Sequence, residues 1–315
     1  MNTSIRDILR NHGKQLESAL NLEAGSARIE VQSLLQSVLR VNRAWLLGHP
    51  EQLLDTGQHE RYFALLERRM RGEPVAYLLG EREFYGLNFK VSTATLIPRP
   101  ETELLVELAL QRCGRVAAAP PGAHRPAPRG CLTRLGPCRV LDLGTGSGAI
   151  ALSIAHACPD AEVVAVDASA AALEVAQSNA QRLDARNVRM LLSDWFGALR
   201  DEWFDIIVSN PPYIAAGDTH LEQGDVRFEP RDALASGNDG LADIRRICAQ
   251  AGNHLRENGW LMMEHGHDQA AQVRALLQQS GFEQIFSARD LAGIERVSGG
   301  INAAKKTAGS TCRFC

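Results

Sequence analysis

Val-Leu-Asp-Leu-Gly-Thr-Gly-Ser-Gly, residues 140–148, is the stretch that decides the fold of this chain. A short strand runs into three closely spaced glycines, and the small apolar residues from Ala149 to Cys158 then predict a helix. Glycines at such a joint let the backbone pass close to a ligand, and the N-terminus of the helix offers free N–H groups. The stretch predicts a strand–loop–helix unit with a ligand at its turn.

Short apolar segments alternate with amphipathic helices beyond this unit. Strands are expected at 163–166, 188–192, 204–209 and 260–263, and helices at about 170–183 and 240–256. This alternation is typical of a parallel, doubly wound α/β sheet with a Rossmann-like order of elements. We predict that residues 101–300 form this domain.

The N-terminal region has a different pattern. Apolar residues recur at helical spacing over residues 1–80, among them Leu34, Leu35, Val38 and Leu39, which predicts a small helical domain. We separately expect this domain to serve in substrate recognition. Residues 81–100 are expected to form a β-hairpin (84–91) and an extended linker, with a helix starting at Glu101.

Two segments depart from globular composition. Residues 113–138 are rich in Pro, Gly, Ala and Arg and have no acidic residue, which predicts a disordered insertion. Its arginines are compatible with RNA contact, but a tolerated surface insertion is favoured because no aromatic residues interleave with them. Residues 301–315 are expected to form a loose tail.

The strand expected at 204–209 ends in Asn210-Pro-Pro-Tyr213. Open α/β sheets bind their ligands at the carboxyl edge, and the prolines stiffen the turn so that the Asn210 amide is held in one place. A rigid amide beside a cofactor can grip another amide or an amino group on a ring. This pattern indicates methylation of a planar nitrogen, provided that the chain also binds a methyl donor.

Acidic residues end two neighbouring strands. Asp167 ends the second strand, where a carboxylate can accept both hydroxyls of a ribose, although a helix N-cap is the alternative. Asp194 can accept an adenine amino group, and Trp195 can pack on the ring or simply in the core. These residues suit NAD as well as S-adenosylmethionine; Asn210 to Tyr213 favour the latter, because they have no role in hydride transfer.

Composition excludes several other classes. The net charge of −3 gives no global signal for nucleic-acid binding, and no apolar stretch approaches the length of a membrane span. Charged residues among the first twenty argue against a signal peptide, and seven scattered cysteines fit reduced thiols. We expect a cytoplasmic protein that does not bind nucleic acid or membranes stably, and that is monomeric because no exposed apolar helix or edge stands out.

Six segments together resemble the bacterial release-factor glutamine N5-methyltransferases, and the resemblance covers about residues 1–298. They are Ile97–Thr102, Leu141–Gly148, Asp167, Ser193–Phe196, Asn210–Tyr213 and Asp225–Pro230. The resemblance implies a class I methyltransferase fold, S-adenosylmethionine as cofactor, and the glutamine of the Gly-Gly-Gln motif of peptide chain release factors as substrate. The insertion and the tail depart from the family pattern without touching these segments.

The predicted site follows from the strand ends and from this resemblance. The cofactor-binding residues are Gly144, Thr145, Gly146, Ser147, Gly148, Asp167, Asp194, Trp195 and Asn210. The substrate-binding residues are Asn210, Pro211, Pro212 and Tyr213, with Asn210, Pro211 and Tyr213 as the catalytic ones. The Asn210 side chain and the Pro211 carbonyl would each accept one substrate N–H, and Tyr213 would pack on the flat amide.

Rival interpretations remain at this point. A ribosomal-protein glutamine methyltransferase, a DNA or RNA amino-methyltransferase and a non-catalytic adaptor that binds S-adenosylmethionine all share part of the pattern. Glu264-His-Gly-His267 and Cys312-Arg-Phe-Cys315 offer metal ligands but lack further ligands at useful spacing, so no metal is expected. Arg227, Phe228 and Glu229 lie in a long loop that forms either a lid or plain packing.

Overall fold

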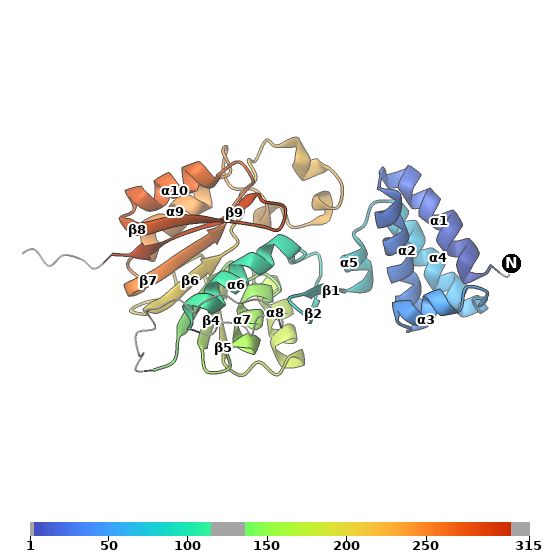
Figure 1. Cartoon of the computed structure of the whole chain (residues 1–315), viewed down its shortest axis with the longest axis horizontal. Coiled ribbons are helices and arrows are strands. Elements are labelled where there is room, and N and C mark those ends of the chain that lie inside the picture. Colours follow the sequence, from blue (N-terminus) through green and yellow to red (C-terminus); the bar gives the residue numbers. More distant parts are fainter. Residues whose placement is uncertain (1–2, 115–135, 304–315) are drawn as a thin grey trace, which may run out of the picture. The chain divides into compact units, whose positions relative to one another are not determined.

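The computed structural model describes residues 3–114 and 136–303 (Figure 1). Most of the insertion predicted at 113–138 and of the tail predicted at 301–315 lies outside these residues. The chain divides into two compact units, the first comprising Met1–Arg82, Val91–Thr93 and Thr219–Glu229, and the second Glu83–Lys90, Ala94–Asp218 and Pro230–Cys315. The predicted domain limits near 80 and 100 stay a prediction.

Helices form the body of the first unit: α1 (Ile5–Leu20), α2 (Ala24–Leu39), α3 (Arg43–Gly48), α4 (Thr56–Met70) and α5 (Val75–Leu79). Their apolar sides share one core, in which Leu34, Leu35 and Tyr62 are fully buried. Asp55 caps α4, because its carboxylate accepts the Gln58 N–H (2.7 Å) while the Gln58 side chain accepts the Asp55 N–H (3.0 Å). The predicted helical character of this region is confirmed.

A two-stranded hairpin follows, with β1 (Glu81–Phe84) and β2 (Leu87–Lys90). Tyr85 and Gly86 at its turn have φ values of 51° and 73°. Two consecutive positive φ values match the twist of a tight hairpin. The hairpin begins three residues earlier than the sequence pattern indicates.

The second unit is built around a seven-stranded sheet with the order β5-β4-β3-β6-β7-β9-β8. Its strands are β3 (Arg139–Leu143), β4 (Glu162–Asp167), β5 (Val188–Leu192), β6 (Phe204–Ser209), β7 (Leu255–Glu264), β8 (Phe282–Arg289) and β9 (Glu295–Asn302). The first five are parallel, whereas β9 runs antiparallel to both β7 and β8. The doubly wound α/β class is confirmed, but the expectation of a wholly parallel sheet is wrong for β9, which runs antiparallel to both of its neighbours.

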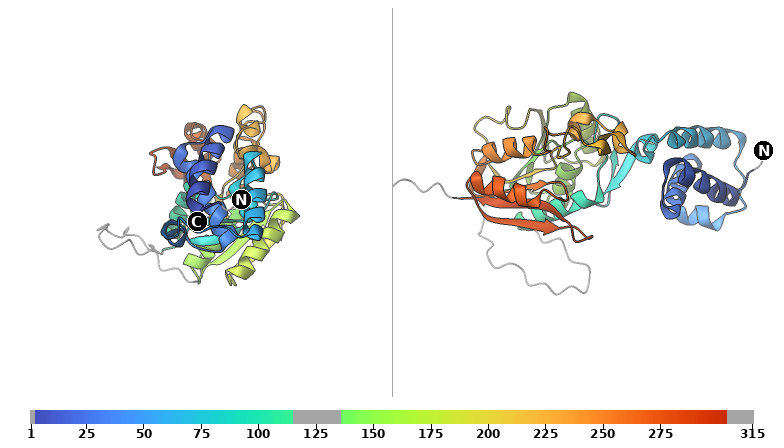
Figure 2. Two further views of the ribbon diagram at one scale, coloured as in Figure 1. Left: turned by 90° about the vertical axis from the view of Figure 1, so that its right-hand side faces the viewer. Right: turned by 90° about the horizontal axis from the view of Figure 1, so that it is seen from above.

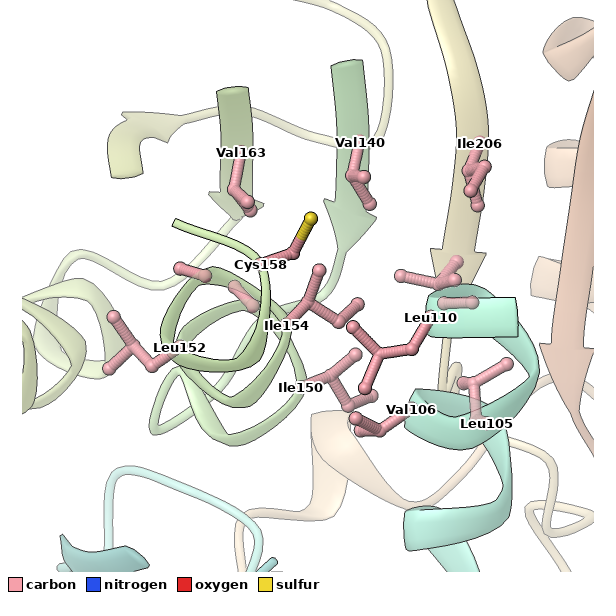
Figure 3. Packing of buried hydrophobic residues seen from close by; sticks show 14 of the residues in the cluster. Leu105, Val106, Leu110, Val140, Ile150, Leu152, Ile154, Cys158, Val163 and Ile206 are labelled. Atoms are coloured by element: carbon pink, nitrogen blue, oxygen red, sulfur yellow. The ribbon is translucent and has the colours of Figure 1, made fainter. Parts of the chain in front are cut away.

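Helices cover both faces of this sheet (Figures 1 and 2). One face carries α6 (Glu103–Arg112), α7 (Ala149–Ala157) and α8 (Ala170–Arg182), and the other α9 (Ala242–Ala251) and α10 (Ala270–Gln279). Because side chains alternate along a strand, Val140 packs against α6 and α7 while Leu141 packs on the opposite side. Figure 3 shows Leu110 of α6 and Ile154 of α7 meeting the strand residue Val140.

Two element boundaries differ from expectation. The helix predicted over 240–256 ends at Ala251, because Gly252 and Asn253 interrupt it before β7. The segment predicted to start a helix at Glu101 instead forms a short 3-10 turn, Pro100–Thr102, before α6 begins. Further 3-10 turns lie at Thr219–Glu222, Val226–Phe228 and Arg231–Ala233. Within the described ranges, no helix combines the length and apolarity that crossing a membrane requires.

Candidate active site

A cavity of about 570 Å³ opens at the carboxyl edge of the sheet. The residues that follow β3, β4, β5 and β6 all contribute to its lining. The chain crosses from one side of β3 to the other between β5 and β6, and such switch points are where open α/β sheets bind ligands. Its size is that of a small-molecule site.

The glycine loop between β3 and α7 forms the floor of the cavity. Gly144, Gly146 and Gly148 have φ values of 71°, 56° and 83°, a conformation that side chains with a Cβ rarely adopt. A Cβ at Gly144 would lie 3.5 Å from the Trp195 ring, and one at Gly148 only 2.9 Å from Leu152 Cδ1. Thr145 and Ser147 complete the loop and also line the cavity.

Asp142 holds this loop from behind, and the sequence analysis did not assign it a role. Its Oδ2 accepts hydrogen bonds from Thr145 Oγ1 (2.7 Å) and from the Ala151 N–H (3.2 Å). The carboxyl is fully buried, its Oδ1 has no hydrogen-bond partner among the described residues, and burial raises its pKa to about 7. The position of Asp142 among the apolar residues Val140, Leu141 and Leu143 was the sequence signal that could have identified this role.

Asp167 lies at the end of β4 and lines the cavity. Its Oδ2 accepts the Gly146 N–H (2.8 Å) and its Oδ1 accepts the Ser169 N–H (2.9 Å). The alternative role as helix cap is taken by Ser169, whose hydroxyl accepts from the Ala172 N–H at the start of α8. Asp167 therefore ties the glycine loop to the neighbouring strand end while facing the cavity.

Asp194 and Trp195 follow β5 and both line the cavity. The Trp195 Nε1–H donates to Asp243 Oδ1 (3.2 Å), and Asp243 Oδ2 accepts from the buried Ser236 hydroxyl (2.8 Å). Asp194 is exposed and pairs with Arg246 (2.8 Å). Asp243 of α9 therefore fixes the indole at the rim of the cavity. This contact could not be predicted from the sequence.

Asn210 and Pro212 line the cavity after β6. The Asn210 Nδ2 donates to Thr102 Oγ1 (3.2 Å), and Thr102 is itself buried and lines the cavity. Pro211 is buried, and Tyr213 is half-buried; both lie outside the lining, and the Tyr213 hydroxyl donates to Glu264 Oε1 (3.3 Å). The four residues are therefore held together, but only two of them face the cavity.

The segment Asp225–Pro230 divides between the two units. Pro230 lines the cavity, whereas Asp225 accepts a hydrogen bond from the buried Arg69 of α4 (2.8 Å). Arg227 donates to the Arg71 carbonyl (2.9 Å) just after α4. Within the first unit these residues are packing contacts, and a lid formed by residues 227–229 stays a prediction.

The alternative metal ligands around Glu264 have other partners. Both ring nitrogens of His265 are engaged, Nδ1 with the Gly266 carbonyl (2.9 Å) and Nε2 with Ser298 Oγ (2.8 Å), and burial lowers the pKa of this ring. Across residues 3–114 and 136–303, no group of three or more His, Cys, Asp or Glu side chains is placed to hold a metal ion. The second candidate, Cys312 to Cys315, lies outside the described residues.

A doubly wound sheet with an antiparallel last strand pair, a glycine loop, and acidic and aromatic side chains at its carboxyl edge defines a Rossmann-like methyltransferase. Residues 131–228 match the family described as "Methyltransferase small domain", and residues 8–80 the family described as "PrmC N-terminal domain". The catalytic domain of hMettl16, solved in complex with MAT2A 3'UTR hairpin 6, shares the fold with a TM-score of 0.53 at 15% identity, over 76% of this chain and 83% of that one.

Curated relatives narrow the class to one family. A release factor glutamine methyltransferase from Bordetella pertussis is 52% identical over 280 residues, which are 88% of this chain and 96% of the relative. One from Burkholderia pseudomallei is 49% identical over 91% of this chain and 94% of the relative. The chain belongs to the release factor glutamine methyltransferase family.

Proposed function

We propose that this protein transfers a methyl group from S-adenosylmethionine to the side-chain amide nitrogen of a glutamine in peptide chain release factors. The glutamine is that of the Gly-Gly-Gln motif. The observation that carries the proposal is the Asn210 amide, fixed at the edge of a cavity that also holds a glycine loop and the Asp167 carboxylate. Relatives at about half identity, named for this activity, support the same substrate class.

The cavity residues fit the methyl donor. Trp195 lines the cavity beside Gly144, and its aromatic ring is the surface that we assign to packing on the flat nucleobase. Asp167 offers carboxylate oxygens for ribose hydroxyls, and Asp194 offers an acceptor for an amino group at the rim. When bound, S-adenosylmethionine supplies a methyl group on a positively charged sulfur, which is open to attack by a nucleophile.

The chain's own residues must activate a weak nucleophile. An amide nitrogen attacks poorly because its lone pair is delocalised into the carbonyl group. The Asn210 Oδ1 and the Pro211 carbonyl are the acceptors we assign to its two N–H groups. Two acceptors orient the nitrogen and stabilise the positive charge that develops on it, and the proton leaves during or after transfer, so no strong base is needed.

The same acceptors select the substrate. A glutamate carboxylate at this position would bring its oxygens against the two acceptor oxygens, which costs binding free energy. Glutamine is therefore preferred over glutamate. Tyr213 is assigned to packing on the substrate amide. Its hydroxyl donates to Glu264, so the face of its ring is the part that we assign to this contact.

Incubation with labelled methyl donor tests the proposal. Purified release factors, ribosomal proteins and DNA are offered separately, together with a release factor whose motif glutamine is replaced by glutamate. Label is expected on intact release factors at that glutamine and not on the variant. Label on a ribosomal-protein glutamine would move the substrate within the same chemistry, and label on DNA alone would overturn the proposal.

We further propose that the protein acts as a monomer in the cytoplasm without stable binding to nucleic acid. The net charge of −3 and the scattered cysteines support this setting. Size-exclusion chromatography with light scattering, with and without RNA, measures the oligomeric state and RNA binding, and cell fractionation tests the location.

A further inference from the structure

A buried carboxyl group, that of Glu264, lies behind the turn formed by Asn210–Tyr213. Glu264, at the end of β7, is 2% exposed and accepts the Tyr213 hydroxyl at 3.3 Å. The side chain of Thr102, which is 4% exposed, also acts on Glu264 and lowers the pKa of its carboxyl group by hydrogen bonding. Thr102 in turn accepts the Asn210 Nδ2–H at 3.2 Å. Asn210 and Tyr213, the two ends of the turn, are thereby connected to one carboxyl group.

The direction of these hydrogen bonds follows from proton counting. A threonine hydroxyl has one hydrogen to donate, and an ionised carboxylate can only accept. Once Thr102 donates to ionised Glu264, its oxygen is left as an acceptor. The neighbouring end of the Asn210 amide must then be the Nδ2 donor, as the structure has it.

The contact with Thr102 determines whether Asn210 presents a hydrogen-bond donor or an acceptor to a ligand. With Nδ2 committed to Thr102, Oδ1 is the end left for the substrate. If the amide were rotated by half a turn, a donor would face the substrate N–H groups and repel them. The energy difference between the two orientations is therefore set by Thr102 in the cavity wall and by Glu264 behind it.

We propose that Thr102 and Glu264 are positioning residues that hold the Asn210 amide with its oxygen toward the substrate, and that Glu264 anchors Tyr213 in the same turn. The inference rests on the proposed function, in which Asn210 accepts a substrate N–H. By this inference, Pro100–Thr102 and the end of β7 both contribute to the selection of an amide nitrogen as the methyl acceptor.

Protonation of Glu264 would reverse this arrangement. A neutral carboxyl group can donate to Thr102, whose hydrogen is then free to point at Asn210 and favour the flipped amide. Burial raises the pKa of Glu264 to about 7, with Glu101 acting in the same direction and Thr102, Tyr213 and Arg296 opposing it. The turnover rate should therefore fall on the acid side of neutrality.

Substitution of Thr102 tests the inference. Thr102→Val keeps the shape and removes the hydroxyl, and we expect kcat to fall by roughly 10- to 100-fold with little change in KM or in S-adenosylmethionine affinity. Thr102→Ser restores the hydroxyl and should recover most of kcat. Ser153→Ala is the matched control and should keep kcat, because it removes a buried hydroxyl of α7 that has no hydrogen-bond partner among the described residues.

A second readout does not depend on turnover. The side-chain amide protons of Asn210, followed by NMR, should shift in Thr102→Val and return in Thr102→Ser. Glu264→Gln should lower kcat and remove the fall near pH 7. Wild-type kcat in Thr102→Val, or equal losses in the Val and Ser variants, would overturn the inference, whereas a wild-type enzyme that labels no glutamine would instead refute the proposed function.

Discussion

In the proposed mechanism, the chemistry depends on Asn210, because its one amide group has both a donor and an acceptor. The nitrogen donates to Thr102, and the oxygen is the acceptor that we assign to the substrate. An aspartate would present two acceptors and lose the first contact, and an alanine would lose both. Because the Asn210 nitrogen is held by Thr102, the orientation of the amide is defined and its oxygen is the atom available to the substrate.

Asn210→Ala should lower turnover by about 10²- to 10³-fold while S-adenosylmethionine still binds. The acceptor that orients the substrate nitrogen is lost, and loss of one such preorganised group costs about 10²- to 10³-fold in kcat. Single-turnover methylation and calorimetric titration of the cofactor measure the two properties. Near-wild-type methylation by this variant would contradict the assignment.

Asp167→Asn should weaken S-adenosylmethionine binding by about 10- to 100-fold, because hydrogen bonds to a charged acceptor are worth about 1.5–3 kcal/mol. The new amide would also bring N–H against the N–H of Gly146 or Ser169. Titration calorimetry gives the dissociation constant. Glu174→Gln, at an exposed position on α8, is the control, and equal affinity in both variants would argue against the ribose contact.

The element that matters most is the joint between β3 and α7. Three glycines with positive φ turn the chain there, and Asp142 fastens the turn from the strand side. Gly148 has the tightest surroundings, since α7 and α8 both approach it. The joint therefore serves packing and ligand approach at the same time.

Gly148→Ala should lower the free energy of unfolding by about 1–3 kcal/mol. A left-handed backbone costs about 1–2 kcal/mol for a residue with a Cβ, and the new methyl group would lie 2.9 Å from Leu152 Cδ1. Denaturant unfolding measures the change. Gly217→Ala, where no atom lies within 4 Å of the new methyl group, should have a much smaller effect, and equal losses would show that the joint is not special.

The sequence pattern was sufficient for the mainly apolar strands of the sheet. The strand at 204–209 is buried throughout, and Asn210, the residue that follows it, lines the cavity. β8 and β9 were missed because only Phe282 of β8 is buried and because β9 contains Gly299 and Gly300, which weaken a strand pattern. Thr102 and Glu264 were not identified as partners of the turn, because only the folded chain brings them beside Asn210 and Tyr213.

At the scale of the whole molecule, two buried carboxyl groups make stability depend on pH. Burial raises the pKa of Glu264 from 4.5 and of Asp142 from 3.8, in each case to about 7. At a pH between the ordinary pKa and the raised pKa of each group, the folded chain keeps the proton and the unfolded chain releases it. Rising pH therefore favours unfolding, and this contribution to stability is complete below the ordinary pKa and lost above about 7.

Glu264→Gln should flatten the fall of the unfolding free energy between about pH 5 and pH 7. One proton contributes about 1.4 kcal/mol per pH unit, so the slope should decrease by up to that amount while the Asp142 contribution remains. Urea titrations at several pH values measure the slope. Glu257→Gln, at an exposed position of β7, is the control; an unchanged slope in Glu264→Gln would contradict the prediction.

The position of β9 between β7 and β8 bears on how the protein is made. β9 is the last of the seven strands to leave the ribosome, yet it is the strand that pairs with both β7 and β8. Until Glu295–Asn302 emerges, on the order of seconds after β7, one edge of β7 has no partner and β8 has none at all. From the emergence of β7 until that of β9, the nascent chain therefore carries an open sheet edge with which another strand can pair.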